Sequence, residues 1–145
     1  MPSAAASLSG PAGEEERRLI ADPRFQEAVR LFNAADWYAC HDGFEELWHE
    51  TQGPMRPVLQ GILQIAVAQL HLERGNHRGA TMLMGEALGR LSGCGEEALT
   101  LSLEPLRQIA RLRLQTLQAG RDPDTQPLPR LRHRDPETQE LPPVN

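Results

Sequence analysis

The chain contains no lysine, because all 15 of its basic residues are arginine. This absence excludes mechanisms that depend on an ammonium side chain, such as the P-loop grip on phosphate, Schiff-base catalysis and kinase chemistry. Aromatic residues are also scarce, at 4% of the 145 residues, which argues against a large β-sandwich packed on aromatic rings. Hydrophobic residues make up 39% of the chain, which is enough for the core of one small helical domain.

Cysteines are few, and long apolar runs are missing. Cys40 and Cys94 lack the paired spacing of a metal site, which favours reduced thiols in a cytoplasmic protein. Residues 1–13 have neither a basic start nor an apolar run, so they do not resemble a secretory signal, and no stretch reaches the roughly 20 apolar residues of a membrane span. The formal net charge of -5 gives no general attraction to phosphate or anionic lipid. We therefore expect a cytoplasmic protein that binds neither nucleic acid nor membrane.

Capping residues and helical spacing predict about five helices. Asp22 and Pro23 match an N-cap and a first helical position, and Asp36 and Asn76 match two further N-caps. A last helix begins near Ser102.

These helices predict an all-α fold in which stacked antiparallel hairpins form a compact bundle over 22–119. The helix over about 56–74 has the widest apolar surface, so we expect it at the centre. We expect residues 1–21 to be a disordered N-terminal segment, and residues 120–145 to be a disordered tail rich in Pro and Arg.

A weak internal repeat supports the hairpins. A shift of 40 residues places Phe32 on Leu72, Asp36 on Asn76, Cys40 on Ala80, Phe44 on Met84, Leu47 on Ala87 and Trp48 on Leu88. Caps fall on caps and apolar residues on apolar residues, as in two stacked helix-turn-helix units. An open array and a compact bundle both fit this pattern.

Polar residues border the apolar stripes of the second and third predicted helices. At about 100° per residue, His41 and Glu45 lie on one edge of the second helix, and Gln60, Gln64 and His71 lie within about 40° of one another on the third. In an antiparallel hairpin the two rows reach the same level, so we predict a polar cluster of these five residues. The rows face each other for one handedness of the hairpin and apart for the other.

Three interpretations of this polar cluster stay open. The first is a network of satisfied hydrogen bonds that fixes the register of the helices. The second is a metal site, since His and Glu at i and i+4 share a helix face, although no further His-Glu pair or Cys completes a ligand set. The third is an acid-base site. The spacing itself specifies no metal, no cofactor and no catalytic residue.

Three aromatic residues of the second helix form a candidate binding surface: Trp37, Tyr38 and Trp48. The alternative for both tryptophans is an ordinary place in the core.

The run HDGFEELW from His41 to Trp48, the run QGILQIA over 60–66, and His71 followed by RGN over 74–76 resemble the domain of unknown function 309 family. The resemblance covers about residues 22–91. It implies an all-α fold and no activity, because none is established for that family. The family usually has Glu directly after the motif His, whereas this chain has Asp42, and Gly43 then weakens the helix by roughly 1 kcal/mol relative to Ala.

The sequence predicts a helical binding or scaffold module with a protein or ligand partner, because hairpin arrays present grooves and no nucleophile constellation stands out. The alternative is a metal-binding protein or a small hydrolase-like enzyme that uses His41, Glu45 and His71.

Overall fold

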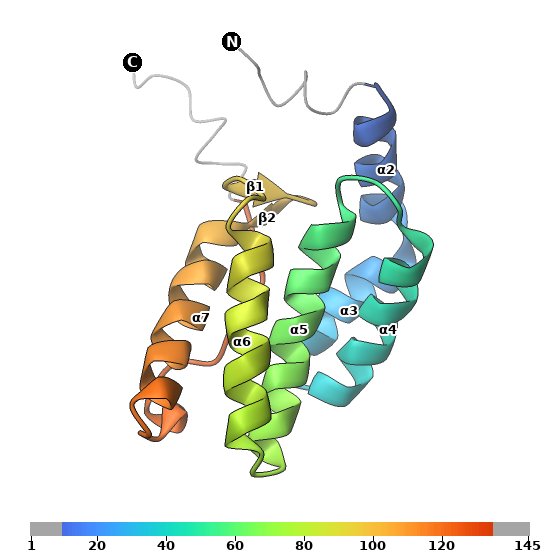
Figure 1. Ribbon diagram of the computed structural model, residues 1–145. Coiled ribbons are helices and arrows are strands. Elements are labelled where there is room, and N and C mark those ends of the chain that lie inside the picture. The colour runs from blue at the N-terminus through green and yellow to red at the C-terminus, as the bar shows by residue number, and fades with distance from the viewer. Residues whose placement is uncertain (1–9, 135–145) are drawn as a thin grey trace, which may run out of the picture.

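The computed structural model describes residues 10–134, most of which lie in six α-helices (Figure 1). The helices are α2 (Gly10–Ala21), α3 (Pro23–Asn33), α4 (Trp37–Glu50), α5 (Arg56–Glu73), α6 (His77–Leu91) and α7 (Leu103–Gln118). The strands β1 (Glu97–Ala98), β2 (Leu101–Ser102) and β3 (Arg132–His133) form an antiparallel sheet in the order β1-β2-β3, and η1 (Pro123–Thr125) is a 3-10 helix. The predicted all-α bundle of antiparallel hairpins is confirmed, with α2 and the small sheet in addition.

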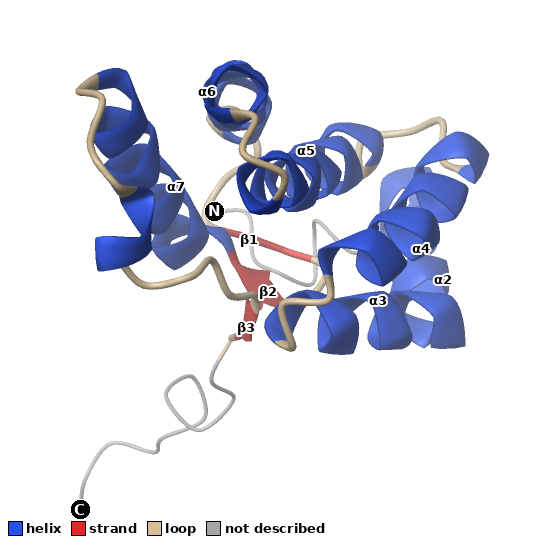
Figure 2. Cartoon of the chain, turned by 90° about the horizontal axis from the view of Figure 1, so that it is seen from below, coloured by secondary structure: helices blue, strands red, loops and turns tan. Residues whose placement is uncertain are grey.

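Helices α3 to α7 follow one another in an arc, and the small sheet lies between the two ends of the arc (Figure 2). Each helix packs on its neighbours in the chain, so α5 lies between α4 and α6. Ten of the 18 residues of α5 are buried, which makes it the central helix that the apolar pattern predicted. In the first hairpin, the Phe32 ring meets the edges of Trp37 and Phe44 at centroid distances of 5.0 and 6.4 Å.

The turns of the two hairpins have the same backbone. Asp36 and Asn76 cap α4 and α6, and their own N–H groups donate back to Leu31 O at 2.9 Å and His71 O at 2.8 Å. The preceding residue is left-handed in both turns, with φ of 60° at Ala35 and 77° at Gly75. From residue 39 to residue 50, every position has the same burial class as the position 40 residues later. The internal repeat is therefore present in the folded chain.

One arginine ties α3 to α4 across the first hairpin. Arg24 Nη1 lies 2.9 Å from Glu46 Oε1, and its Nη2 lies 2.8 Å from Glu50 Oε1. We call these three residues the first clamp. Their side chains are 39% to 59% exposed, so solvent screens the pairs.

A third turn follows α7 but leads only to η1. Gly120 has φ of 70°, and Arg121 N donates to Thr116 O at 2.9 Å, as in the two earlier turns. The segment after η1 is held by Arg113, which is fully buried. Its Nη1 donates to the carbonyls of residues 123, 126 and 127 at 3.1 to 3.2 Å. After this turn the chain therefore has no second α-helix to complete a hairpin within the described residues, and the buried guanidinium of Arg113 holds the segment instead.

The ordered chain extends beyond the predicted domain at both ends. Residues 10–21, which we expected to be disordered, form α2, and Glu15 fixes this helix by accepting from Gly53 N at 2.7 Å and Met55 N at 2.8 Å. Residues 120–134, also expected to be disordered, return to the first hairpin. There the Asn33 side chain pairs with the backbone of Leu131, at 2.9 Å from Nδ2 to O and 2.7 Å from N to Oδ1. The remainder of both predicted segments lies outside the described residues.

Within residues 10–134, none of the helices combines the length and the apolar character needed to cross a bilayer.

Candidate functional site

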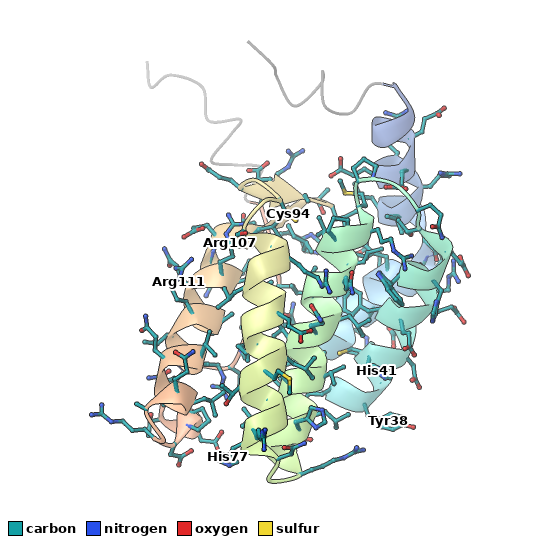
Figure 3. The ribbon with its side chains drawn as sticks, in the orientation of Figure 1. Tyr38, His41, His77, Cys94, Arg107 and Arg111 are labelled. Carbon is teal, nitrogen blue, oxygen red and sulfur yellow. The ribbon has the colours of Figure 1, made fainter. Side chains whose placement is uncertain are left out.

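His41, Glu45 and Trp48 lie along one side of α4, and we call them the α4 row. The Asp36 cap starts the helix, and at about 100° per residue these three positions fall on one face. All three are half-buried. His41 Nε2 lies 3.7 Å from Glu45 Oε1, which makes these two side chains neighbours on the row. Figure 3 shows His41 on the lower half of α4, above Tyr38.

Two ring nitrogens of the α4 row are buried without a hydrogen-bond partner. Among the described residues, four buried side-chain polar atoms have none, and two of these are His41 Nδ1 and Trp48 Nε1. Asp42 Oδ1 lies 3.3 Å from His41 Nδ1 without forming a hydrogen bond to it. Folded proteins leave few buried polar groups unpaired, so each such group requires an explanation. The row therefore keeps hydrogen-bonding capacity that the fold does not use.

Arg56, at the start of α5, fixes the indole at the upper end of the row. Its guanidinium carbon lies 4.1 Å from the centre of the Trp48 ring. The same group donates from Nη1 to Trp48 O at 2.8 Å and to Thr51 O at 3.0 Å, which satisfies carbonyls at the end of α4. Arg56 therefore couples the ring orientation of Trp48 to the turn between α4 and α5.

On α5, the predicted polar residues Gln64 and Gln60 turn to α6. Gln64 is buried, its Nε2 donates to Glu86 Oε1 at 2.9 Å, and its Oε1 accepts from Arg90 Nε at 3.0 Å. We call Gln64, Glu86 and Arg90 the second clamp. With its amide turned to suit its neighbours, Gln60 Oε1 also accepts from Arg90, at 3.2 Å from Nη2 and 3.3 Å from Nε.

His71 lies at the end of α5, where its Nδ1 is 3.2 Å from Nδ2 of the α6 cap, Asn76. Within the described residues its hydrogen bond serves this turn, and none joins it to His41 or Glu45. The structure thus brings His41 and Glu45 together on α4 and Gln60 and Gln64 together at α6, and it places His71 at the end of α5, bonded to the turn before α6.

The three aromatic residues of the candidate binding surface occupy different environments. Trp37 is 3% exposed and belongs to the core, whereas the Tyr38 side chain is 57% exposed. Trp48 is half-buried against the core. The alternative that both tryptophans are core residues therefore holds for Trp37.

Metal-binding and nucleophilic groups do not gather at this site. Among residues 10–134, no three His, Cys, Asp or Glu side chains are grouped so that they could hold a metal ion. Burial raises the pKa of the Cys40 thiol to about 12, and its Sγ donates to Trp37 O at 3.5 Å. Cys40 is therefore a protonated core residue at neutral pH.

Glu86 and Arg90 were not predicted, although the sequence contains a signal for them. They stand 40 residues after Glu46 and Glu50, and Gln64 stands 40 residues after Arg24. The repeat therefore places the second clamp on the same three positions as the first.

Packing against α3 explains why a glycine stands at position 43 of the HDGFEELW run. A Cβ atom at this position would lie 3.3 Å from the Cβ of Ala28 on α3. The glycine lets α3 and α4 approach closely, which offsets part of its cost to the helix.

The family model of the Domain of unknown function (DUF309) matches residues 25–83, from α3 to the first half of α6. This range contains the whole α4 row and Arg56. No match was found among curated proteins. The match to residues 25–83 confirms the resemblance that the motifs between His41 and Asn76 predicted.

Proposed function

We propose that this chain is a binding module whose partner is a protein segment held by the α4 row. The observation that carries the proposal is the pair of buried, unpaired ring nitrogens, His41 Nδ1 and Trp48 Nε1. A donor that is buried without a partner costs about 1–3 kcal/mol, so a ligand that pairs with it recovers part of that free energy.

The second hairpin serves as an internal reference. Its residues at the positions of the α4 row are Thr81, Gly85 and Leu88. Thr81 Oγ1 donates to His77 O at 2.7 Å, and the other two residues have no polar side-chain atoms. An equivalent hairpin therefore folds without imidazole, carboxylate or indole on this face, which supports a binding role for these groups in the first hairpin.

The chemistry of the α4 row favours a polypeptide as ligand. The Trp48 indole donates a hydrogen bond, so it takes a carbonyl or another acceptor. The Glu45 carboxylate accepts hydrogen bonds and repels anions, and its side chain is 45% exposed. A peptide segment supplies both a neutral carbonyl and an N–H donor, and this combination complements the row.

The test is affinity capture from the native host under mild lysis, with the full chain as bait. Trp48→Leu and His41→Thr install the residues of the second hairpin, so both variants should fold. We expect a stoichiometric partner that the wild type retains and that each variant recovers at least about tenfold less well, equivalent to about 1.4 kcal/mol.

Met82→Ala is the matched control, because Met82 is an exposed apolar residue on α6 with 57% exposure. Capture by Met82→Ala should equal that of the wild type. Equal recovery by all four proteins, or no stoichiometric partner at all, would contradict the proposal.

The metal or hydrolase alternative has no comparable support. It needs His71 beside His41 and Glu45, and His71 instead bonds to the α6 cap.

A further inference from the structure

Tyr38 extends the α4 row toward the lower end of α4. Its ring meets the ring of His41 edge to face, at a centroid distance of 6.3 Å and an interplanar angle of 81°. Figure 3 shows Tyr38 directly below His41. Tyr38 is 57% exposed, and the Glu45 side chain is 45% exposed. An exposed tyrosine beside a half-buried polar row offers a large contact area with a hydroxyl group at its tip, which is a common feature of protein interfaces.

The spacing of these four residues is that of a coiled-coil seam. Intervals of three, four and three residues separate Tyr38, His41, Glu45 and Trp48. This is the a-d-a-d pattern by which two helices pack along each other. The outer two residues and the inner two are both centred on residue 43, and the middle of α4 falls between residues 43 and 44. The spacing is therefore the same when the helix is reversed, so the seam fits a second copy of itself in an antiparallel pair.

An antiparallel pair of α4 helices brings complementary side chains together. Residues at equal distances on opposite sides of the centre face each other, so Tyr38 faces Trp48 of the second copy and His41 faces Glu45 of the second copy. The Tyr38 hydroxyl accepts hydrogen bonds, and Trp48 Nε1 is a buried donor without a partner in the described chain. An imidazole N–H donates to a carboxylate, and His41 Nδ1 also lacks a partner there. Both contacts occur twice, because a two-fold interface repeats every contact.

Charge favours the antiparallel pair over a parallel one. A parallel pair would place Glu45 against Glu45 of the second copy, and like charges that meet across an interface are unfavourable. The second hairpin lacks this complementarity, since its equivalent residues are Arg78, Thr81, Gly85 and Leu88. There the outer pair would join an arginine to a leucine, and the inner pair a threonine to a glycine. The self-complementary pattern is therefore specific to α4 and does not follow from the repeat.

We propose that the protein segment held by the α4 row is α4 of a second copy of this chain, in an antiparallel pair with two-fold symmetry. This inference rests on the proposed function, because it names the partner of the same row. Tyr38 and Glu45 of each copy complete the site of the other. Since α4 has 14 residues and is about 21 Å long, the contact is short and suits a reversible dimer.

The test is sedimentation velocity of the purified full chain at concentrations up to about 0.5 mM, where we expect a reversible monomer-dimer equilibrium. His41→Glu places a carboxylate against Glu45 of the second copy, and Glu45→Arg places a guanidinium against His41. Each variant alone should therefore raise the dissociation constant of the dimer by about tenfold or more. An equimolar mixture of the two variants should recover the dimer, because the new carboxylate of one chain then faces the new guanidinium of the other, and the second inner contact keeps its wild-type pair.

Disulfide trapping tests the direction of the pair. A mixture of Tyr38→Cys and Trp48→Cys should form a cross-link between positions 38 and 48 of two chains, which mass spectrometry of the joined peptides identifies. A parallel pair would instead join position 38 to position 38 in Tyr38→Cys alone, and this result would contradict the proposal.

The matched controls are Arg78→Glu and Glu14→Arg, which reverse two exposed charges away from α4 and should dimerise as the wild type does. The proposal is overturned if the wild type stays a monomer throughout the concentration range, if the two row variants dimerise as well as the wild type, or if their mixture does not recover the dimer. A monomeric wild type that still captures another protein through the α4 row would overturn the self-association alone and leave the proposed function standing. Row variants that change neither the dimer nor the capture would overturn both.

Discussion

In the first hairpin Arg24 joins two glutamates of α4, whereas in the second hairpin Gln64 joins a glutamate and an arginine of α6. The three positions are equivalent under the repeat, and only the residue types differ. The same three positions therefore make the contact in both hairpins, but with different chemistry. The first clamp is exposed and fully charged, and the second is built around a buried neutral amide. Polar residues at these positions join the two helices of each hairpin.

The α4 row differs from the two clamps. The equivalent positions of the second hairpin have no polar side-chain group that lacks a hydrogen-bond partner. A hairpin of this type therefore folds without the polar groups of the α4 row. The comparison thus separates Gln64, a predicted site residue with a structural contact, from His41, Glu45 and Trp48. The predictions below test this difference between Gln64 and the α4 row, and the role of Arg113 after α7, where the chain continues into η1 instead of a further α-helix.

The largest effect is expected at Arg113, which holds the C-terminal segment where the repeat lacks a second helix. Arg113→Ala removes every donor to Gln69 and to three backbone carbonyls, so we expect a loss of about 3 kcal/mol in the free energy of unfolding. Arg113→Lys should lose less, because it keeps the charge but not the planar set of donors. Urea denaturation measures both, and an unchanged midpoint for Arg113→Ala would show that the segment does not depend on this residue.

The second clamp should matter more than the first. Gln64→Ala leaves polar groups of Glu86 and Arg90 without their buried partner, and we expect a loss of about 1–2 kcal/mol. Arg24→Ala should cost less, because its partners are exposed and screened.

A double-mutant cycle sharpens this prediction. Gln64 and Glu86 should couple by about 0.5 kcal/mol or more, and Gln64 and Glu45 should be additive within about 0.5 kcal/mol. Strong coupling between Gln64 and Glu45 would instead restore a single polar cluster between α4 and α5.

A smaller effect is expected in the turns. Ala35 and Gly75 have the same left-handed backbone, which costs a residue with a Cβ atom about 1–2 kcal/mol. Part of this is offset by the larger unfolded-state entropy of glycine, so Ala35→Gly should stabilise the chain by about 0.5 kcal/mol. Gly75→Ala should destabilise it by about 1 kcal/mol, because no atom within 4 Å blocks the methyl group and only the backbone strain remains. The measurement is the thermal midpoint of each variant relative to the wild type. If Ala35→Gly and Gly75→Ala shift the midpoint in the same direction, the two turns are not equivalent.

The smallest effect concerns pH. Arg24 holds the pKa values of Asp22 and Glu50 below their ordinary range through hydrogen bonds and charge. A carboxyl with a lowered folded-state pKa contributes stability above its unfolded pKa, and this contribution is lost as the pH falls through the folded value. Arg24→Gln, which copies Gln64 into the first hairpin, should therefore reduce the loss of stability below about pH 4. Urea midpoints of both proteins between about pH 7 and pH 3 would show this, and parallel curves would contradict it.

The sequence predicted the features that depend on a few neighbouring residues, such as the starts of the helices. Asp22, Asp36 and Asn76 bond to the N–H groups of their own helices, so the helix starts follow from three or four residues of sequence. The orientation of Gln64 depends on how α5 turns against two neighbours, and helical spacing permits either side. The burial of Arg113 depends on carbonyls that the returning segment brings to it, which no periodicity indicates.

The Asn33 pair with Leu131 changes how the domain is expected to unfold. In a linear array each unit touches only its neighbours, so the ends fray first and opening proceeds inward in steps. Here two hydrogen bonds span 98 residues, and Glu16 Oε2 accepts from Leu99 N across 83 residues. The first helices and the later segments therefore hold each other. Fraying of α3 must release the returning segment in the same event. The backbone amides of α3 and of β2 are therefore expected to exchange with solvent through one shared, cooperative opening, as parts of a single folding unit.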